Sequence, residues 1–177
     1  MCIRDRHAGG TYEGDVVVRR PDGSMSAINI PDAIDVRCFA RKPDGTIIAG
    51  TGRGLAEIAP DGKITTRYAS DGETNDEWIR SVVVTPQGDI WVGSFGNGIS
   101  VYDPSYRKKN TFGTWNELRT NTVNQLMRSH DGKIWAATGE GLVCFSADGN
   151  IIKAYRTTEG LPDNVVKSIC ELSLIHI

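Results

Sequence analysis

Two glycine-rich segments have the residue spacing of phosphate-binding loops. They are Gly50-x-Gly52-x-Gly54 and Gly96-x-Gly98. A phosphate-binding loop needs a helix directly after it, because the helix N-terminus supplies the amide donors and a favourable dipole. No helical pattern follows either segment. We therefore interpret both segments as tight corners between strands.

The other reactive residue types form no recognisable catalytic set. No combination of Ser, His and Asp, no pair of carboxylates and no His/Cys cluster has the spacing of a catalytic or metal site. The sequence therefore predicts no catalytic residue, no metal and no cofactor in this chain, and it favours a binding module over an enzyme. Cys38, Cys144 and Cys170 lie within apolar strand patterns, where a thiol is expected to act as a small core side chain.

The four tryptophans divide into two pairs. Trp91 and Trp135 occupy the same position in two copies of a repeat, which favours a packing role, because buried aromatic side chains dominate core energetics. Trp78 and Trp115 do not recur. A tryptophan that belongs to one copy only, in a connection between copies, is the better candidate for ligand specificity.

These residues are positioned by a tandem repeat of 43 or 44 residues, whose turn glycines are Gly45, Gly88 and Gly132. A constant period of this length indicates one supersecondary unit copied in tandem. In the first complete copy we predict strands at 36–40, 46–49, 55–59 and 64–68, joined by Asp-Gly turns of the kind that close hairpins. In the middle copy residues 102–109 replace the second such turn, and we expect that turn to be longer and more exposed.

Four-stranded antiparallel meanders of this length are typical of β-propeller blades, which bury their faces only against one another. We therefore predict an all-β fold, a β-propeller fragment with three whole and two partial blades in an incomplete ring. The expected units are a blade tail at 7–33, blades at about 34–77, 78–120 and 121–163, and the start of another blade at 164–171.

Residues 1–6 and 172–177 do not follow the repeat. Both hexapeptides resemble the translation of one transposon-end sequencing adapter read in opposite directions, so we expect these ends to be adapter-derived and the surrounding gene to be longer. The net charge of the whole chain is −2 with both signs dispersed. This pattern favours neither nucleic-acid binding nor membrane contact, and no apolar run reaches the length of a membrane span.

Three motifs resemble the two-component regulator propeller repeat, whose consensus runs GLPxNxVxxI and then GxLWIGTxxGLxxYD. They are Leu161-Pro162-Asp163-Asn164-x-Val166-x-x-Ile169, Gly132-x-Ile134-Trp135-x-x-Thr138-x-x-Gly141-Leu142, and Gly98-Ile99-x-x-Tyr102-Asp103. The resemblance covers residues 34–171. It departs at Ile48, where the consensus has Trp, and at Ala136-Ala137, where it has Ile-Gly.

The resemblance implies an extracytoplasmic, periplasmic sensor propeller of a hybrid histidine kinase, which recognises an oligosaccharide and regulates signal transduction and transcription. Partners would be a small-molecule or oligosaccharide ligand, further blades of the same parent chain and a second copy of the parent in a homodimer. Ser129-His130-Asp131-Gly132-Lys133-Ile134-Trp135 is also similar to the Asp-box of sialidase propellers. It is one residue short, and we interpret it as a structural turn with a solvated His130.

In this arrangement the d–a and b–c connections of all blades lie on one face, where strands a to d are numbered in chain order within a blade. We expect the ligand surface there. Its candidate residues are Arg53, Trp78, Arg80, Phe95, Asn97, Arg119, Asn121 and Glu140. Two alternatives remain open at this point: a propeller enzyme of the virginiamycin B lyase or glycosidase type, and a pure protein-interaction propeller.

Overall fold

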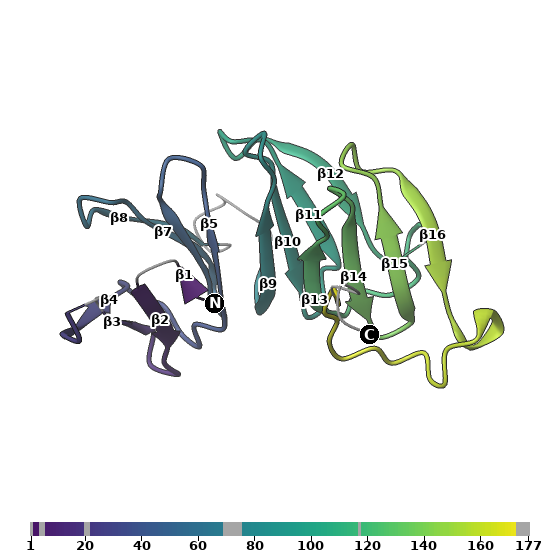
Figure 1. The fold of residues 1–177 in the computed structure, drawn as a ribbon, viewed down its shortest axis with the longest axis horizontal. Helices are drawn as coiled ribbons and strands as arrows, with labels where there is room; N and C mark the ends of the chain where they lie inside the picture. The colour runs from purple at the N-terminus through teal and green to yellow at the C-terminus, as the bar shows by residue number, and fades with distance from the viewer. Residues whose placement is uncertain (1, 4–5, 20–21, 69–75, 117, 173–177) are drawn as a thin grey trace.

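The computed structural model describes residues 2–3, 6–19, 22–68, 76–116 and 118–172. These residues form four antiparallel sheets of four strands each (Figure 1). The only helical element among them is the single 3₁₀ turn η2 (Thr157–Glu159). The predicted all-β propeller architecture is confirmed.

Every sheet is a meander in which each strand pairs with the next along the chain. The first sheet contains β1 (Cys2–Ile3), β2 (Arg6–Gly10), β3 (Asp15–Arg19) and β4 (Met25–Asn29). The second contains β5 (Cys38–Arg41), β6 (Ile47–Gly50), β7 (Gly54–Ile58) and β8 (Ile64–Tyr68). The third contains β9 (Ile79–Val84), β10 (Ile90–Ser94), β11 (Ile99–Tyr102) and β12 (Lys108–Phe112). The fourth contains β13 (Val123–Arg128), β14 (Ile134–Thr138), β15 (Gly141–Phe145) and β16 (Ile151–Tyr155).

The terminal hexapeptides are only partly described. Strand β1 lies within residues 1–6, which we expect to be adapter-derived, and it pairs with β2 as the first strand of that sheet. Residues 1, 4–5 and 173–177 lie outside the described residues, as do residues 69–75 of the expected blade at 34–77.

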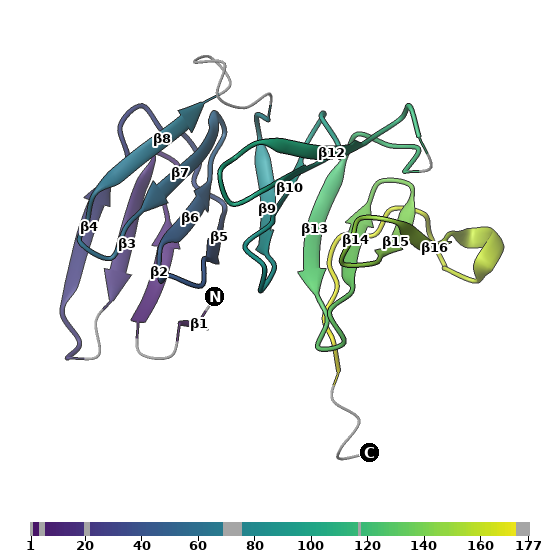
Figure 2. The same ribbon diagram turned by 90° about the horizontal axis from the view of Figure 1, so that it is seen from above.

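The four sheets spread outward from their first strands. The first strands of neighbouring sheets contact one another, β5 with β9 and β9 with β13. Figure 2 shows these three strands close together in the middle of the view, while β4 and β16 lie at its opposite sides. Sheets whose first strands converge in this way are blades of a propeller rather than layers of a linear stack.

A separate apolar core fills each junction between neighbouring sheets. Ile30, Val36 and Tyr68 contribute to the junction of the first and second sheets, and Ile48 and Ile79 to that of the second and third. Fully burying one such aliphatic side chain stabilises the fold by roughly 1.5–3 kcal/mol. A blade therefore depends on its neighbours for most of its apolar burial.

Trp91 confirms the packing role predicted for the recurring tryptophan. Its side chain is fully buried between the third and fourth sheets. The ring stacks on Phe112 at a centroid distance of 6.1 Å and meets Phe145 edge-on at 5.4 Å. The equivalent Trp135 lies on the outer face of the fourth sheet, partly buried, and stacks on Tyr155 at 6.1 Å.

The turn of the middle copy corrects our expectation. The loop between β11 and β12 is five residues long, like the loop between β7 and β8, and equivalent pairs of backbone hydrogen bonds close both. Tyr106 occupies the position of Gly62 and has a φ of 62°, where Gly62 has 90°. The turn is not more exposed, because the Tyr106 ring is buried against the second sheet. Packing of the Tyr106 ring thus stabilises a left-handed backbone conformation that the other copies reach with glycine.

The cysteines bear out the core interpretation only in part. Cys38 lies in β5 and Cys144 in β15, and burial raises the pKa of the Cys38 thiol to about 12. Cys170 is exposed and lies in no strand, which contradicts the expectation. The apolar residues around Cys170 belong to the segment after the fourth sheet, which has no following sheet to cover it.

Residues 164–171 run along β13 without forming a strand. The amide of Val166 donates to the carbonyl of Thr138, and the amide of Ile169 donates to the Gln125 side chain. Among the described residues, no helix is long and apolar enough to cross a lipid bilayer.

Candidate functional site

The b–c corners hold the ends of their strands with one repeated hydroxyl. Thr51, Ser94 and Thr138 are fully buried, and each donates its side-chain hydroxyl to the carbonyl of the glycine that ends the corner, at 2.9, 3.2 and 2.7 Å. A buried hydroxyl is stable only when it is hydrogen-bonded. The glycine-rich segments are therefore structural corners, as predicted, and their amides are used within the fold.

Such corners also hydrogen-bond to the chain at or just before the first strand of the next sheet. The carbonyl of Thr51 accepts from the amide of Ile79 at 3.0 Å, and that of Thr11 accepts from the amide of Val36 at 3.1 Å. The b–c corner of one blade therefore lies directly beside the d–a connection of the next. This contact creates the face on which we predicted the ligand surface.

Trp78 lies at this contact with a strained backbone. Its amide donates to the carbonyl of Gly52, and its φ is 50°, a left-handed value that is unusual for a bulky residue. Its side chain is 46% exposed, although such a ring gains most by burial. An exposed aromatic ring on a strained backbone is typical of a functional position.

Phe95 and Arg80 complete a cluster with Trp78. The carbonyl of Trp78 accepts from the amide of Phe95 at 3.0 Å, and the guanidinium of Arg80 lies 4.4 Å above the centroid of the Phe95 ring. Arg80 also donates to the side-chain oxygen of Asn124 at 2.8 Å. Phe95 is 52% exposed. We call Trp78, Arg80 and Phe95 the aromatic cluster.

The other candidate residues lie around this cluster without forming one pocket. Asn121 accepts from the amides of Gly96 and Gly98 and fastens the corner that carries Phe95. Arg53, Asn97 and Glu140 are exposed at successive b–c corners, and Arg119 is exposed in a d–a connection. Direct contacts thus join Trp78 to Phe95 through the backbone and Phe95 to Arg80 through its ring, while Asn121 contacts Gly96 and Gly98 of the same corner. The role of the other four candidate residues in binding stays a prediction.

Sequence reasoning missed three residues beside Arg80. An open depression of about 300 Å³ is lined by Arg37, Arg80, Asn124 and Lys167. Each follows directly after the first buried or half-buried aliphatic residue of a blade, which is Val36, Ile79, Val123 or Val166. The signal was present in the sequence as a basic or amide residue recurring every 43 or 44 positions.

The cations of the depression differ in their local partners. Arg37 forms an ion pair with the buried Asp35 at 2.5 Å, and this hydrogen bond raises the pKa of the Arg37 guanidinium. Asn124 accepts from Arg80 and donates to the carbonyl of Val166 at 2.7 Å, so it links three successive blades. Lys167 is exposed and makes no ion pair with any residue that the structure describes.

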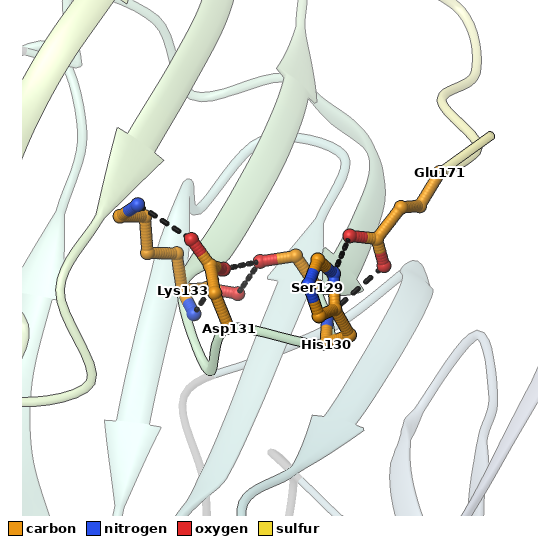
Figure 3. Close-up of polar contacts among 5 residues, drawn as sticks. All are labelled: Ser129, His130, Asp131, Lys133 and Glu171. Carbon is orange, nitrogen blue, oxygen red and sulfur yellow. Dashed lines mark hydrogen bonds and ion pairs between the residues drawn. The ribbon is translucent and has the colours of Figure 1, made fainter. Parts of the chain in front are cut away.

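The opposite end of β13 carries the segment that is similar to an Asp-box. Figure 3 shows Asp131 between Ser129 and Lys133, with His130 turned away toward Glu171. Lys133 and Ser129 lower the pKa of Asp131, and Glu171 raises that of the exposed His130. His130 is thus a surface residue, but it holds Glu171 through both its amide and its ring. The contacts are those of a turn that fastens the 164–171 segment.

Potential metal ligands do not gather in the described parts of the chain, where no group of three or more His, Cys, Asp or Glu side chains could hold an ion. The polar residues with unusual surroundings lie instead at the depression and the aromatic cluster. The arrangement offers groups that can bind a ligand, namely the exposed side chains of Trp78 and Phe95 and the guanidinium of Arg80 next to the Phe95 ring.

No protein-family model matches the sequence, and no curated protein matches it either. Solved structures do match. The extracellular domain of BT3049 from B. thetaiotaomicron, described as a hybrid two component system, is 29% identical with a TM-score of 0.78 over 89% of this chain and 22% of that one. The corresponding domain of BT4673 from the same organism is 20% identical with a TM-score of 0.62, over 88% of this chain and 22% of that one.

A streptogramin B lyase has a similar fold, with 13% identity and a TM-score of 0.62 over 81% of this chain and 48% of the lyase. The chain thus spans about a fifth of the two-component structures and about half of the lyase. The motif order, the blades that the motifs form and the similarity to the BT3049 domain agree. The described residues form β-propeller blades that are similar to those of the BT3049 domain, which is consistent with the two-component regulator propeller repeat.

Proposed function

We propose that this chain is part of the extracytoplasmic, ligand-sensing propeller of a hybrid two-component system and that it binds an oligosaccharide at the aromatic cluster. The observation that supports the proposal most directly is the exposure of the Trp78 side chain. Its ring is exposed on a strained backbone, and the carbonyl of Trp78 accepts from the amide of Phe95, whose exposed ring lies 4.4 Å from the Arg80 guanidinium. Sugar rings present apolar C–H faces and hydroxyl groups, which match aromatic faces flanked by hydrogen-bond donors.

The location rests on the similarity to the BT3049 domain, which is described as extracellular. Signalling would follow if ligand binds one arrangement of the propeller more tightly than another, because a ligand shifts a conformational equilibrium only by its differential affinity. In a homodimer of the complete protein, such a conformational shift would be transmitted to the two output domains of the dimer.

The test is a calorimetric titration of the complete extracytoplasmic region with a panel of plant and host oligosaccharides. Trp78→Ala should weaken binding of the recognised sugar by about tenfold or more, since an aromatic anchor in a binding site is worth on the order of 2 kcal/mol. Met25→Ala is the control, because Met25 is also an exposed apolar side chain, at 67%, but lies in β4 at the outer edge of the first sheet.

Equal affinity of the wild-type protein and the Trp78→Ala variant would remove the cluster from the binding site. Consumption of a probe, with a new product in the calorimeter cell, would instead favour a propeller enzyme. Binding of a peptide but of no saccharide would favour a protein-interaction propeller.

A further inference from the structure

The depression beside the aromatic cluster gathers cations from successive blades. Arg37, Arg80 and Lys167 occupy equivalent positions of three blades, and Asn124 occupies that position in the remaining one. The repeat explains why the four residues converge, because the same position of each blade faces the same central space. It does not explain why three of the four are basic.

Packing does not require the three cations. Arg37 and Lys167 are exposed, and Arg80 is only partly buried, so none fills a core position. Like charges gathered in one depression repel one another, which costs stability unless a counter-charge is present. Among the described residues, Arg80 contacts the neutral Asn124 and the Phe95 ring, and the carboxylate of Asp35 is already paired with Arg37.

None of the described residues that line the depression carries a carboxylate. Asp35 offsets one of the three positive charges, which leaves a positively charged depression with an amide donor and a guanidinium fork. Guanidinium and ammonium groups make their strongest hydrogen bonds to carboxylate, sulfate and phosphate oxygens. The aromatic cluster shares Arg80 with the depression, so a sugar ring on Phe95 would place its substituents beside these donors.

We propose that the depression lined by Arg37, Arg80, Asn124 and Lys167 binds the oxyanion of an acidic saccharide, a uronate carboxylate or a sulfate ester. This inference rests on the proposed function, because it identifies the class of saccharide that the aromatic cluster would bind. Lys167 and Arg80 act as donors to the oxyanion, and Asn124 orients Arg80 across the boundary between two blades.

The experiment compares three galactose-configured oligosaccharides of equal length that differ only at C6. The C6 group is a free hydroxyl in the first, a carboxylate in the second and a sulfate ester in the third. Titration of the complete extracytoplasmic region should show about tenfold or tighter binding of a charged probe than of the neutral one, as expected for charge-assisted hydrogen bonds. The preferred charged probe identifies whether carboxylate or sulfate is the recognised group. Its affinity should fall as ionic strength rises.

Lys167→Gln is the primary variant, because Lys167 is exposed and its loss leaves no buried partner unpaired. It should weaken the charged probe by about three- to tenfold and leave the neutral probe unchanged. Arg80→Gln should weaken both probes, because Arg80 belongs to the aromatic cluster as well. Arg128→Gln is the matched control: it removes one exposed positive charge at the far end of β13 and should change neither affinity.

The outcomes separate the two proposals. Binding of all three probes with equal affinity would overturn the oxyanion site and retain a saccharide-binding propeller. Binding of no saccharide at all would overturn both. Equal effects of Lys167→Gln and Arg128→Gln on the charged probe would show a general charge effect and would also overturn the site. Tight binding of an acidic peptide in place of any saccharide would retain the basic depression and overturn its assignment to sugars.

Discussion

Tyr106 stands at a turn position where the other two complete copies have Gly62 and Gly149. A tyrosine with φ of 62° is strained by on the order of 1–3 kcal/mol. Burial of its ring and contacts with two cations offset this strain. Lys42 and Arg67 lie 4.6 and 4.1 Å from the ring centroid. Burial together with Glu57 raises the pKa of Tyr106, so the hydroxyl stays neutral.

Tyr106→Gly relieves the backbone but removes this ring from the junction of the second and third sheets. We expect a net loss of about 2 kcal/mol in the free energy of unfolding, because truncating a buried aromatic side chain costs more than the backbone strain. The measurement is denaturant unfolding of the longest form of the protein that melts cooperatively. Tyr106→Phe, which keeps the ring, should change stability much less. A glycine variant as stable as wild type would show that burial of the ring does not outweigh the backbone strain.

His130 gives a residue-scale prediction about pH. Glu171 raises the pKa of His130 above 6.5, so this contact is complete below pH 6.5 and is lost as the pH rises through the raised value. His130 lowers the pKa of Glu171 below 4.5, so the contact is present above pH 4.5 and is lost as the pH falls through the lowered value. The 164–171 segment should therefore be held best between pH 4.5 and 6.5.

The check is an NMR titration of the His130 imidazole. Glu171→Gln should move the His130 pKa back toward 6.5, because it removes the hydrogen bond and the charge that raise it. An unchanged pKa in this variant would show that Glu171 does not contact His130 in solution. Figure 3 shows both contacts between the two residues.

At the scale of the elements, neighbouring blades approach most closely where the second strand of one meets the first strand of the next. A Cβ added at Gly93 in β10 would lie 2.6 Å from Cγ1 of Val123 in β13. The same position in β6 is Gly50, where an added Cβ would lie 2.6 Å from Cγ2 of Ile79 in β9. Both clashes involve β-branched side chains, which are stiff and yield little.

Gly93→Ala should therefore destabilise the junction of the third and fourth sheets by about 1–3 kcal/mol, as expected for overpacking. Gly139→Ala is the matched control, because its Cβ would meet nothing closer than 3.4 Å and its backbone is not left-handed. That variant should stay within about 0.5 kcal/mol of wild type. Equal effects of the two substitutions would show that the close approach at Gly93 does not constrain the blades.

At the scale of the whole molecule, the outer face of the fourth sheet is not covered by another sheet of the described residues. Trp135 and Tyr155 stack on the outer face of the fourth sheet, where Ile152 is 53% exposed. Trp91, the equivalent of Trp135, is fully buried because the fourth sheet covers it. Uncovered blades forgo roughly 1.5–3 kcal/mol for each aliphatic side chain left in water.

We expect residues 7–171, purified alone, to aggregate or to unfold without cooperativity. Size-exclusion chromatography followed by thermal circular dichroism tests this expectation. The control is the same segment within the complete protein, which should melt cooperatively. A monomeric 7–171 segment with a sharp thermal transition would refute the dependence on neighbouring blades.

Much of the fold follows from local chemistry. The recurring turn glycines, the Asp-Gly hairpins and the hydroxyl of each b–c corner act within a few residues of one another, so their consequences can be read along the chain. The predicted strand 64–68 agrees with β8 (Ile64–Tyr68), and the other strands of that sheet lie within two residues of the predicted bounds. The middle turn was the exception, because the tyrosine that replaces its glycine is stabilised by residues of another blade.

The site shows the same division. The sequence singled out the non-recurring Trp78. Its contact with Phe95, and the place of Arg80 in both the aromatic cluster and the depression, depend on the tertiary structure. Arg37, Asn124 and Lys167 carried a periodic signal, but the sequence does not show that one position of each blade faces a common space. Sequence alone determined the repeating unit, because hairpins and corners are short-range. Tertiary structure decided which residues meet, because they come from different blades and converge only when the first strands pack side by side.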